Sequence, residues 1–241
     1  MPRIHVEIEL TSGADCVLPA AAAHHLRDVL RLARGAELVL FNGRGGEYAA
    51  QLLAVTRGEV RAAVGSFRLG AVESPLAVTL VQSISRGERM DYTIQKAVEL
   101  GVRHLVPVTS TRTVVRLNSA REEKRLEHWR GIARHAAEQS GRTAVPAVAT
   151  VLSLAAWLAN ASQTRAYLLD PFATSSLAAQ PAPAGDVAIV AGPEGGFSSD
   201  EKAQMARAGV IPVRLGPRVL RTETAALCAL TILQMQWGDL G

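Results

Sequence analysis

Cysteine and long apolar runs are scarce in this sequence of 241 residues, and each shortage excludes a class of protein. The two cysteines, Cys16 and Cys228, lie far apart and outside any CxxC or His/Cys cluster, which argues against a disulfide framework and a structural zinc site. No apolar run approaches the ~20 residues of a membrane helix, and the start MPRIHVEIEL lacks the apolar core of a secretory signal. We therefore expect a cytoplasmic protein that binds no metal and enters no membrane.

Lysine and aromatic residues are scarce too. Only three of the 26 basic residues are lysine, and the rest are arginine, whose planar guanidinium suits phosphates and bases, although genomic base composition would also explain the excess. Residues 71–150 hold 12 basic and 8 acidic residues, whereas the flanking thirds are nearly neutral. Aromatics make up 4% of the chain, which argues against a sheet that stacks bases. We expect an RNA partner recognised by shape and phosphates.

Residues 1–72 are predicted to form a small, mostly β domain. The sequence NGRGG at 42–46 is a hairpin signal, and apolar residues at helical spacing predict one helix over 22–33. The dipeptide at 74–75, Ser-Pro, interrupts the pattern and sets the boundary. The predicted strands are 3–10, 37–41, 47–55 and 59–67.

From residue 73 to residue 241, predicted strands and helices alternate, which indicates an α/β domain with a parallel sheet covered by helices. The segment 171–186 is rich in Pro, Ala and Ser and is predicted to be a surface connection. The predicted strands are 76–84, 102–108, 165–169, 187–191 and 210–215. The predicted helices are 92–100, 119–139, 198–208 and 222–237.

Two glycine-bearing loops follow predicted strands, at the sheet edge where parallel sheets bind ligands. The loop GPEGGFS (192–198) matches neither a Walker A loop nor the GxGxxG fingerprint, and alone it reads as an ordinary turn. The loop LGPRVLRTETA (215–225) gathers two arginines, Thr222 and Glu223 before an apolar helix. Thr222 could cap that helix and Glu223 could favour its dipole, which leaves the two arginines unexplained.

Together these two loops resemble the SPOUT methyltransferase superfamily, and within it the RsmE family, the small-subunit ribosomal RNA uridine-N3 methyltransferases. The similarity extends over nearly the whole chain. Arg86 departs from the pattern, because the family often has lysine there. Four further segments resemble the family: SRGERMDYTIQKAVELGV (85–102), AAEQSGR (136–142), HHLRDVLR (24–31) and LFNGRGGEY (40–48).

The resemblance implies an N-terminal PUA-like β-barrel, residues 1–72, that binds RNA. It implies a C-terminal SPOUT α/β domain, residues 73–241, with a trefoil knot and an S-adenosylmethionine site within 165–241. The enzyme would be a homodimer acting on 16S ribosomal RNA in an assembled or nearly assembled small subunit. The residues expected to hold the cofactor are Leu169, Gly192, Pro193, Glu194, Gly195, Gly196, Leu215, Gly216, Leu220 and Thr222.

Methylation at N3 of uridine requires loss of the ring proton and stabilisation of the resulting anion. Glu223 is the candidate base and Arg221 the candidate cation, with Arg218 as the alternative cation. Glu194 is an alternative base with an equally good structural interpretation, and a solvent-derived base is a third.

Eight arginines are candidate RNA contacts, although each alone is as readily a solvated surface residue. A non-catalytic RNA-binding or ribosome-assembly factor is the second hypothesis, and a knotted enzyme acting on another base or on transfer RNA is the third. The candidate RNA contacts are Arg3, Arg27, Arg31, Arg86, Arg112, Arg130, Arg134 and Arg142.

Overall fold

The computed structural model describes residues 1–70, 72–113, 119–160 and 165–241, and in it the chain divides into two units. Unit 1 comprises Met1–Glu73 and Ala137–Val145, and unit 2 comprises Ser74–Ala136 and Pro146–Gly241. The second piece of unit 1 differs from the prediction of one continuous domain from residue 73 onward.

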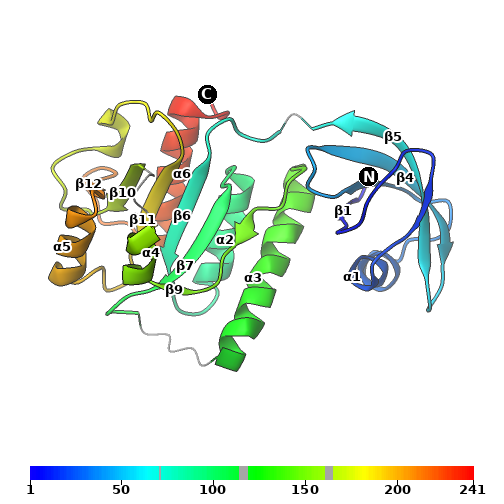
Figure 1. Ribbon diagram of the computed structural model, residues 1–241, viewed down its shortest axis with the longest axis horizontal. Coiled ribbons are helices and arrows are strands. Elements are labelled where there is room, and N and C mark those ends of the chain that lie inside the picture. Colours follow the sequence, from blue (N-terminus) through cyan, green and yellow to red (C-terminus); the bar gives the residue numbers. More distant parts are fainter. Residues whose placement is uncertain (71, 114–118, 161–164) are drawn as a thin grey trace. The chain divides into compact units, whose positions relative to one another are not determined.

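Unit 1 is built on a five-stranded sheet in the order β1-β3-β4-β5-β2, drawn in blue to cyan in Figure 1. The pair β1 and β3 is parallel and the other pairs are antiparallel. One face of the sheet packs on a core that includes Ile4, Leu38, Leu40 and Leu52. The strands are β1 (Arg3–His5), β2 (Asp15–Val17), β3 (Glu37–Phe41), β4 (Gly46–Val55) and β5 (Val60–Leu69).

The helix of unit 1 is shorter than predicted. It begins as α1 (Ala20–His24) and continues as a π-helical turn, η1 (His25–Val29). Leu26 is buried, but Val29 is 58% exposed, so the predicted apolar stripe does not all face the core. Arg31 has a φ of +52°, in the left-handed region that ends helices, and this is why the helix does not reach residue 33.

A cluster of charged side chains explains why residues 137–145 belong to unit 1. Arg3 pairs with Glu47 and also donates to the carbonyl oxygens of Gly141 and Arg142, both at 3.0 Å. Arg142 in turn donates to Glu73 at 2.6 Å. These contacts join positions about 140 and 70 residues apart, which no local pattern encodes.

Unit 2 contains a sheet in the order β12-β10-β11-β6-β7-β8, with β9 also paired to β7, and all of these pairs are parallel. This agrees with the predicted parallel α/β arrangement. The predicted bounds of β10 and β11 are confirmed. The strands are β6 (Val78–Ser83), β7 (His104–Thr109), β8 (Ala147–Val148), β9 (Leu152–Ser153), β10 (Arg165–Leu169), β11 (Val187–Ala191) and β12 (Ile211–Val213).

Helices cover both faces of this sheet, which is why β11 is buried along its whole length. On one face α4 and α5 pack through Leu154, Trp157 and Met205, and on the other α6 packs on β11, β6 and α2. The short elements β8, β9 and α4 were not predicted. The helices are α2 (Arg89–Glu99), α3 (Ser119–Ser140), α4 (Leu154–Asn160), η2 (Leu177–Ala179), α5 (Ser199–Arg207) and α6 (Thr222–Trp237).

Candidate active site

Unit 2 contains a cavity of about 600 Å³ at the carboxyl ends of β10, β11 and β12. This is the sheet edge at which the two glycine-bearing loops were predicted to meet a ligand. Both loops line the cavity, and the first turn of α6 completes the wall. Its volume lies in the range typical of small-molecule sites.

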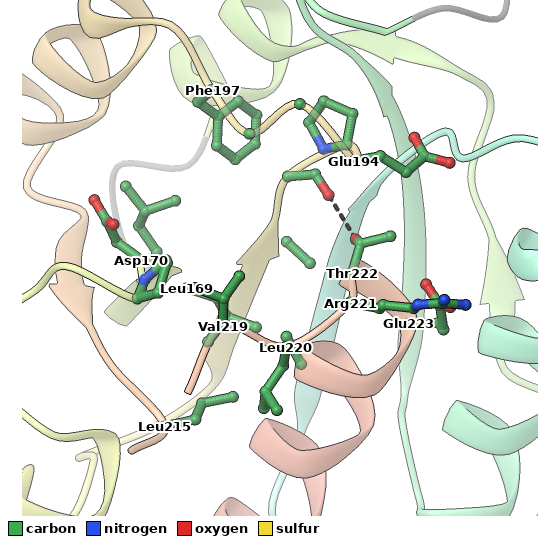
Figure 2. A pocket seen from close by; sticks show the side chains of 18 of the residues that line it. Leu169, Asp170, Glu194, Phe197, Leu215, Val219, Leu220, Arg221, Thr222 and Glu223 are labelled. Atoms are coloured by element: carbon green, nitrogen blue, oxygen red, sulfur yellow. Dashed lines mark hydrogen bonds between the residues drawn. The ribbon is translucent and has the colours of Figure 1, made fainter. Parts of the chain in front are cut away.

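One wall of the cavity is apolar. Leu169 lies at the end of β10, and Leu215, Val219 and Leu220 come from the loop that precedes α6 (Figure 2). Phe197, which is buried, adds an aromatic edge from the loop after β11. Such a wall suits a flat heteroaromatic group, while the loop backbone offers hydrogen-bonding groups beside it.

Thr222 joins the two loops. Its hydroxyl donates to the carbonyl oxygen of Gly192 at 2.5 Å, drawn as a dashed line in Figure 2, and accepts from Nε2 of Gln82 at 2.9 Å. The alternative that Thr222 caps the helix does not hold, because the N-cap residue of α6 is Arg221, without a side-chain cap hydrogen bond. Thr222 instead holds the loop after β11 against the start of α6.

The loop after β11 is a tight turn in which Gly192 has little room for a side chain. The amide of Gly196 donates to the carbonyl oxygen of Pro193 at 2.8 Å, and Gly196 has a φ of +66°, which favours glycine. A Cβ added at Gly192 would lie 3.2 Å from the ring of Phe197. Nη1 of Arg112 donates to the carbonyl oxygen of Gly195 at 2.8 Å and so braces the turn.

Glu194 is held by groups from the start of unit 2. Its Oε1 accepts from the amide of Arg86 at 3.1 Å and from Nη1 of Arg89 at 2.9 Å. Partial burial raises the pKa of Glu194, but hydrogen bonds from backbone amides and from Arg89 outweigh it and lower the pKa overall. A carboxylate held in this way is a weak base, which favours the structural interpretation of Glu194.

Glu223 lines the cavity from the first turn of α6. Its side chain is 14% exposed, and Oε1 lies 3.9 Å from Nε of Arg89. The other oxygen, Oε2, is buried and has no hydrogen-bond partner among the described residues. Arg221 lies beside Glu223 in Figure 2, and both Arg221 and Arg218 are exposed at the cavity.

On the other side of the cavity in Figure 2 lies Asp170, which sequence reasoning missed. Its Oδ2 accepts from Nζ of Lys202 at 2.6 Å, and Lys202 lines the same cavity. Burial raises the pKa of Asp170, but hydrogen bonds from Lys202 and from the amide of Phe172 lower it overall. The position of Asp170 directly after β10 was the available signal.

The structure brings together all of the predicted cofactor and catalytic residues except Gly216, which does not line the cavity. Gly216 has a φ of +127°, so its place in the motif reflects a backbone conformation that favours glycine. Arg89 also lines the cavity and was missed, because the helix that carries it was predicted to begin at residue 92.

Three of the predicted RNA-binding arginines are engaged within unit 1. Arg3 and Arg142 belong to the charged cluster described above, and Arg142 is only 6% exposed. Arg27 donates to Asp28 and to the carbonyl oxygens of two residues in the turn after β4, and its hydrogen bond lowers the pKa of Asp28 to about 2. These three side chains are thus paired within unit 1, and RNA contacts by them stay a prediction.

The other predicted arginines differ in their surroundings. Arg31 and Arg86 are exposed, and Arg112 braces the loop after β11 from the cavity wall. On α3, Arg130 is exposed and donates to the carbonyl oxygen of Val148 at 3.4 Å, while Arg134 is half-buried.

The part of the chain that the structure describes has neither a metal-binding cluster nor a membrane-spanning helix. No group of three or more His, Cys, Asp or Glu side chains there could hold a metal ion. Among the same residues, no helix has the length and apolarity needed to cross a bilayer.

Comparison with known protein families shows to which class of protein the chain belongs. The RNA methyltransferase domain family matches residues 72–234, and the RNA methyltransferase PUA domain family matches residues 18–64. The fold and the cavity are thus those of an RNA methyltransferase domain that follows a PUA domain.

Similar proteins that align with nearly the whole chain identify the family within this class. The chain is 31% identical over 241 residues to the ribosomal RNA small subunit methyltransferase E of Buchnera aphidicola, covering 100% of this chain and 98% of that protein. It is 35% identical to the Mycobacterium bovis protein of the same name, covering 94% and 89%. The chain belongs to the ribosomal RNA small subunit methyltransferase E family, and this confirms the resemblance found in the sequence.

Two solved structures share the whole fold at 37% identity. A methyltransferase of Legionella pneumophila in complex with S-adenosylmethionine has a TM-score of 0.94, covering 99% of this chain and 98% of that one. The ribosomal RNA small subunit methyltransferase E of Neisseria gonorrhoeae, bound to S-adenosylmethionine, has a TM-score of 0.92 and full coverage of both chains.

Proposed function

We propose that this chain transfers a methyl group from S-adenosylmethionine to N3 of a uridine in 16S ribosomal RNA. The observation that carries the proposal is the convergence of the two motif loops on one cavity, with Glu223 and Arg221 at its polar side. The names of the relatives support the cofactor and the ribosomal RNA substrate. The N3 position follows from the family resemblance.

The cavity suits S-adenosylmethionine by its chemistry. The apolar wall formed by Leu169, Leu215 and Leu220 offers a place for the adenine ring, and the glycine turn offers close backbone approach. When bound, this cofactor supplies an electrophilic methyl group on a sulfonium. The chain must therefore place and deprotonate the uridine.

Glu223 is the group proposed to accept the N3 proton. Its Oε2 is buried and without a partner among the described side chains and backbone, so it is free to accept a hydrogen bond from a base in the cavity. Nε of Arg89 places a positive charge 3.9 Å from Oε1 of the same carboxyl group. Loss of the proton leaves an electron pair on N3 that forms the new bond to the methyl carbon, while the methyl–sulfur bond breaks.

Arg221 is proposed to stabilise the uridine anion that forms as the proton leaves. Its guanidinium is exposed at the cavity beside Glu223, with Arg218 as the alternative cation. The N3 edge is paired in a duplex, so the target uridine must be unpaired or extruded to reach these groups.

Exposed arginines on both units are proposed to bind RNA phosphates. Arg31 in unit 1 is exposed and has a positive φ beside a π-helical turn, two features that recur at functional sites. Arg86, Arg130 and Arg134 are proposed to do the same in unit 2.

The proposal also includes the structural and cellular properties that the family resemblance implies. They are a closed PUA-like barrel in unit 1, a trefoil knot in unit 2, a homodimer, a cytoplasmic location and an assembled or nearly assembled small subunit as substrate. Exposed Met235 and Leu240, near the C-terminus, support the dimer, because exposed apolar side chains favour association.

The experiment is methyl transfer from labelled S-adenosylmethionine to small ribosomal subunits from cells that lack this protein. We expect 3-methyluridine in the digest by mass spectrometry. Its rate of formation should fall about 100-fold or more with Arg221→Ala and with Glu223→Gln. Arg207→Ala, an exposed arginine of α5 outside the cavity, is the matched control and should leave the rate unchanged.

Other outcomes would contradict separate parts of the proposal. Label on another nucleoside, or only on transfer RNA, would mean that the substrate is wrong. Full turnover by Glu223→Gln would exclude Glu223 as the base and leave a solvent-derived base. No binding of the methyl donor would favour the RNA-binding or assembly-factor hypothesis.

A further inference from the structure

The ion pair between Asp170 and Lys202 has no role in the reaction derived above, although both side chains line the cavity. Asp170 is 11% exposed, and its Oδ2 lies 2.6 Å from Nζ of Lys202. Its Oδ1 accepts from the amide of Phe172 at 3.1 Å, and its own amide donates to the carbonyl oxygen of Val213. The carboxylate is therefore fixed in place on the cavity wall.

The pair ties the loop after β10 to α5, a connection that does not by itself require charged groups on the cavity wall. The neighbouring wall of the cavity is apolar, formed by Leu169, Leu215 and Val219, and burying a charge among such groups carries a desolvation cost. Charged groups that persist in a ligand cavity despite this cost are candidates for ligand binding.

Each partner keeps hydrogen-bonding capacity beyond the contacts that the structure gives it. A carboxylate has about four lone-pair sites, and Asp170 uses two of them in its contacts with Lys202 and with the amide of Phe172. An ammonium has three donors, and Lys202 uses one of them on Asp170. An acceptor and a donor of opposite charge thus lie side by side on the cavity wall.

A ligand group that matches this arrangement carries an ammonium and a carboxylate close together, as an α-amino acid does. We propose that Asp170 and Lys202 bind the zwitterionic aminobutyrate tail of S-adenosylmethionine, the ammonium on Asp170 and the carboxylate on Lys202. The inference rests on the proposed function, because it takes that cofactor as the ligand. It makes the two residues cofactor-specificity residues, distinct from those that act on the uridine.

A second acid–base pair, Arg89 with Glu194, also lines the cavity but is a poorer match. Arg89 also lies near Glu223, on the side where the uridine is expected, and Glu194 accepts from the amide of Arg86. In Figure 2 Asp170 lies across the cavity from Glu194 and Glu223, with the apolar side chains between them. The Asp170 side is therefore the one available to the cofactor.

The test compares two ligands that differ only in the tail. S-adenosylhomocysteine carries the aminobutyrate group, and 5′-methylthioadenosine has a methyl group in its place. Calorimetry on the full chain measures both dissociation constants for wild type, Asp170→Asn, Lys202→Met and the double variant. Lys96→Met is the matched control, because Lys96 forms a similar ion pair with Glu99 outside the cavity.

We expect each single variant to raise the dissociation constant of S-adenosylhomocysteine by about tenfold to a hundredfold, the range for the loss of a hydrogen bond to a charged group. Binding of 5′-methylthioadenosine should change less than about threefold, which also reports that the cavity is intact. The Lys96→Met variant should bind both ligands as wild type does.

An equal loss of affinity for both ligands would overturn the inference, because the ion pair would then contact the adenosine group or stabilise the fold. Unchanged binding of S-adenosylhomocysteine by the double variant would overturn it too, while leaving the proposed function intact. Failure of wild type to bind either ligand would overturn the proposed function together with the inference.

Discussion

Replacement of Thr222 by valine tests whether its hydroxyl holds the active-site loops together. Valine keeps the shape of the side chain and removes the hydroxyl that donates to Gly192 and accepts from Gln82. Gln82 is buried, so its amide loses a partner that water cannot replace. The loss of these two hydrogen bonds should lower the free energy of unfolding by about 2 kcal/mol, or the melting temperature by about 4–8 °C for a chain of this size.

The assay is thermal unfolding followed by circular dichroism, together with calorimetric binding of S-adenosylhomocysteine. Thr222→Ser is the matched control, because it keeps the hydroxyl and loses only a methyl group. Binding by Thr222→Val should weaken, since Gly192 would no longer be fixed against α6. Equal melting temperatures and affinities for the valine and serine variants would refute this account of Thr222.

Three further outcomes test other parts of the structure. Leu26→Ala should lower the free energy of unfolding of unit 1 by about 2–4 kcal/mol, measured by urea titration. Val29→Ala, on the exposed side of the same turn, should lower it by less than about 0.5 kcal/mol. Equal losses of stability in the two variants would contradict the observed helix. Burial raises the pKa of Glu201, but hydrogen bonds from two backbone amides lower it overall. The contribution of Glu201 to the stability of the fold is therefore present above the unfolded pKa and is lost as pH falls through the folded pKa. Melting curves from pH 7 to pH 3 should therefore show a smaller loss of stability in Glu201→Gln than in wild type. Arg89→Ala should lower the rate of methyl transfer more than Arg89→Lys does, because lysine keeps a positive charge near Glu223; equal rates would argue against this electrostatic role.

The sheet of unit 2 and the location of its cavity were predictable because they depend on local patterns. Buried parallel strands read as short apolar runs, as at 187–191, and their carboxyl ends fix where a ligand binds. The motif loops at 192–198 and 215–225 follow such strands, so the sequence was sufficient to place them at one edge.

The features that were missed depend on contacts between distant residues or on irregular backbone. Asp170 and Lys202 are 32 positions apart, and nothing in either segment indicates that they pair. Arg31 has a left-handed backbone conformation, which an arginine in a sequence does not predict. Every arginine adds the same charge to a basic segment of the sequence, but the side chains of Arg3 and Arg142 form hydrogen bonds within unit 1, which the sequence does not indicate.

The two-piece composition of unit 1 has a consequence for how the protein is made. Its final piece, Ala137–Val145, is separated from Glu73 by Ser74–Ala136, and at about 5–20 residues per second the ribosome spends roughly 3–13 s on that intervening chain. During that interval the carboxylate of Glu73 lacks its partners Arg142, Thr143 and Ala144. All five strands of the N-terminal sheet are already translated by then, but the contacts of Arg3 and Glu73 with residues 141–144 can form only after the first strands of the methyltransferase unit have emerged.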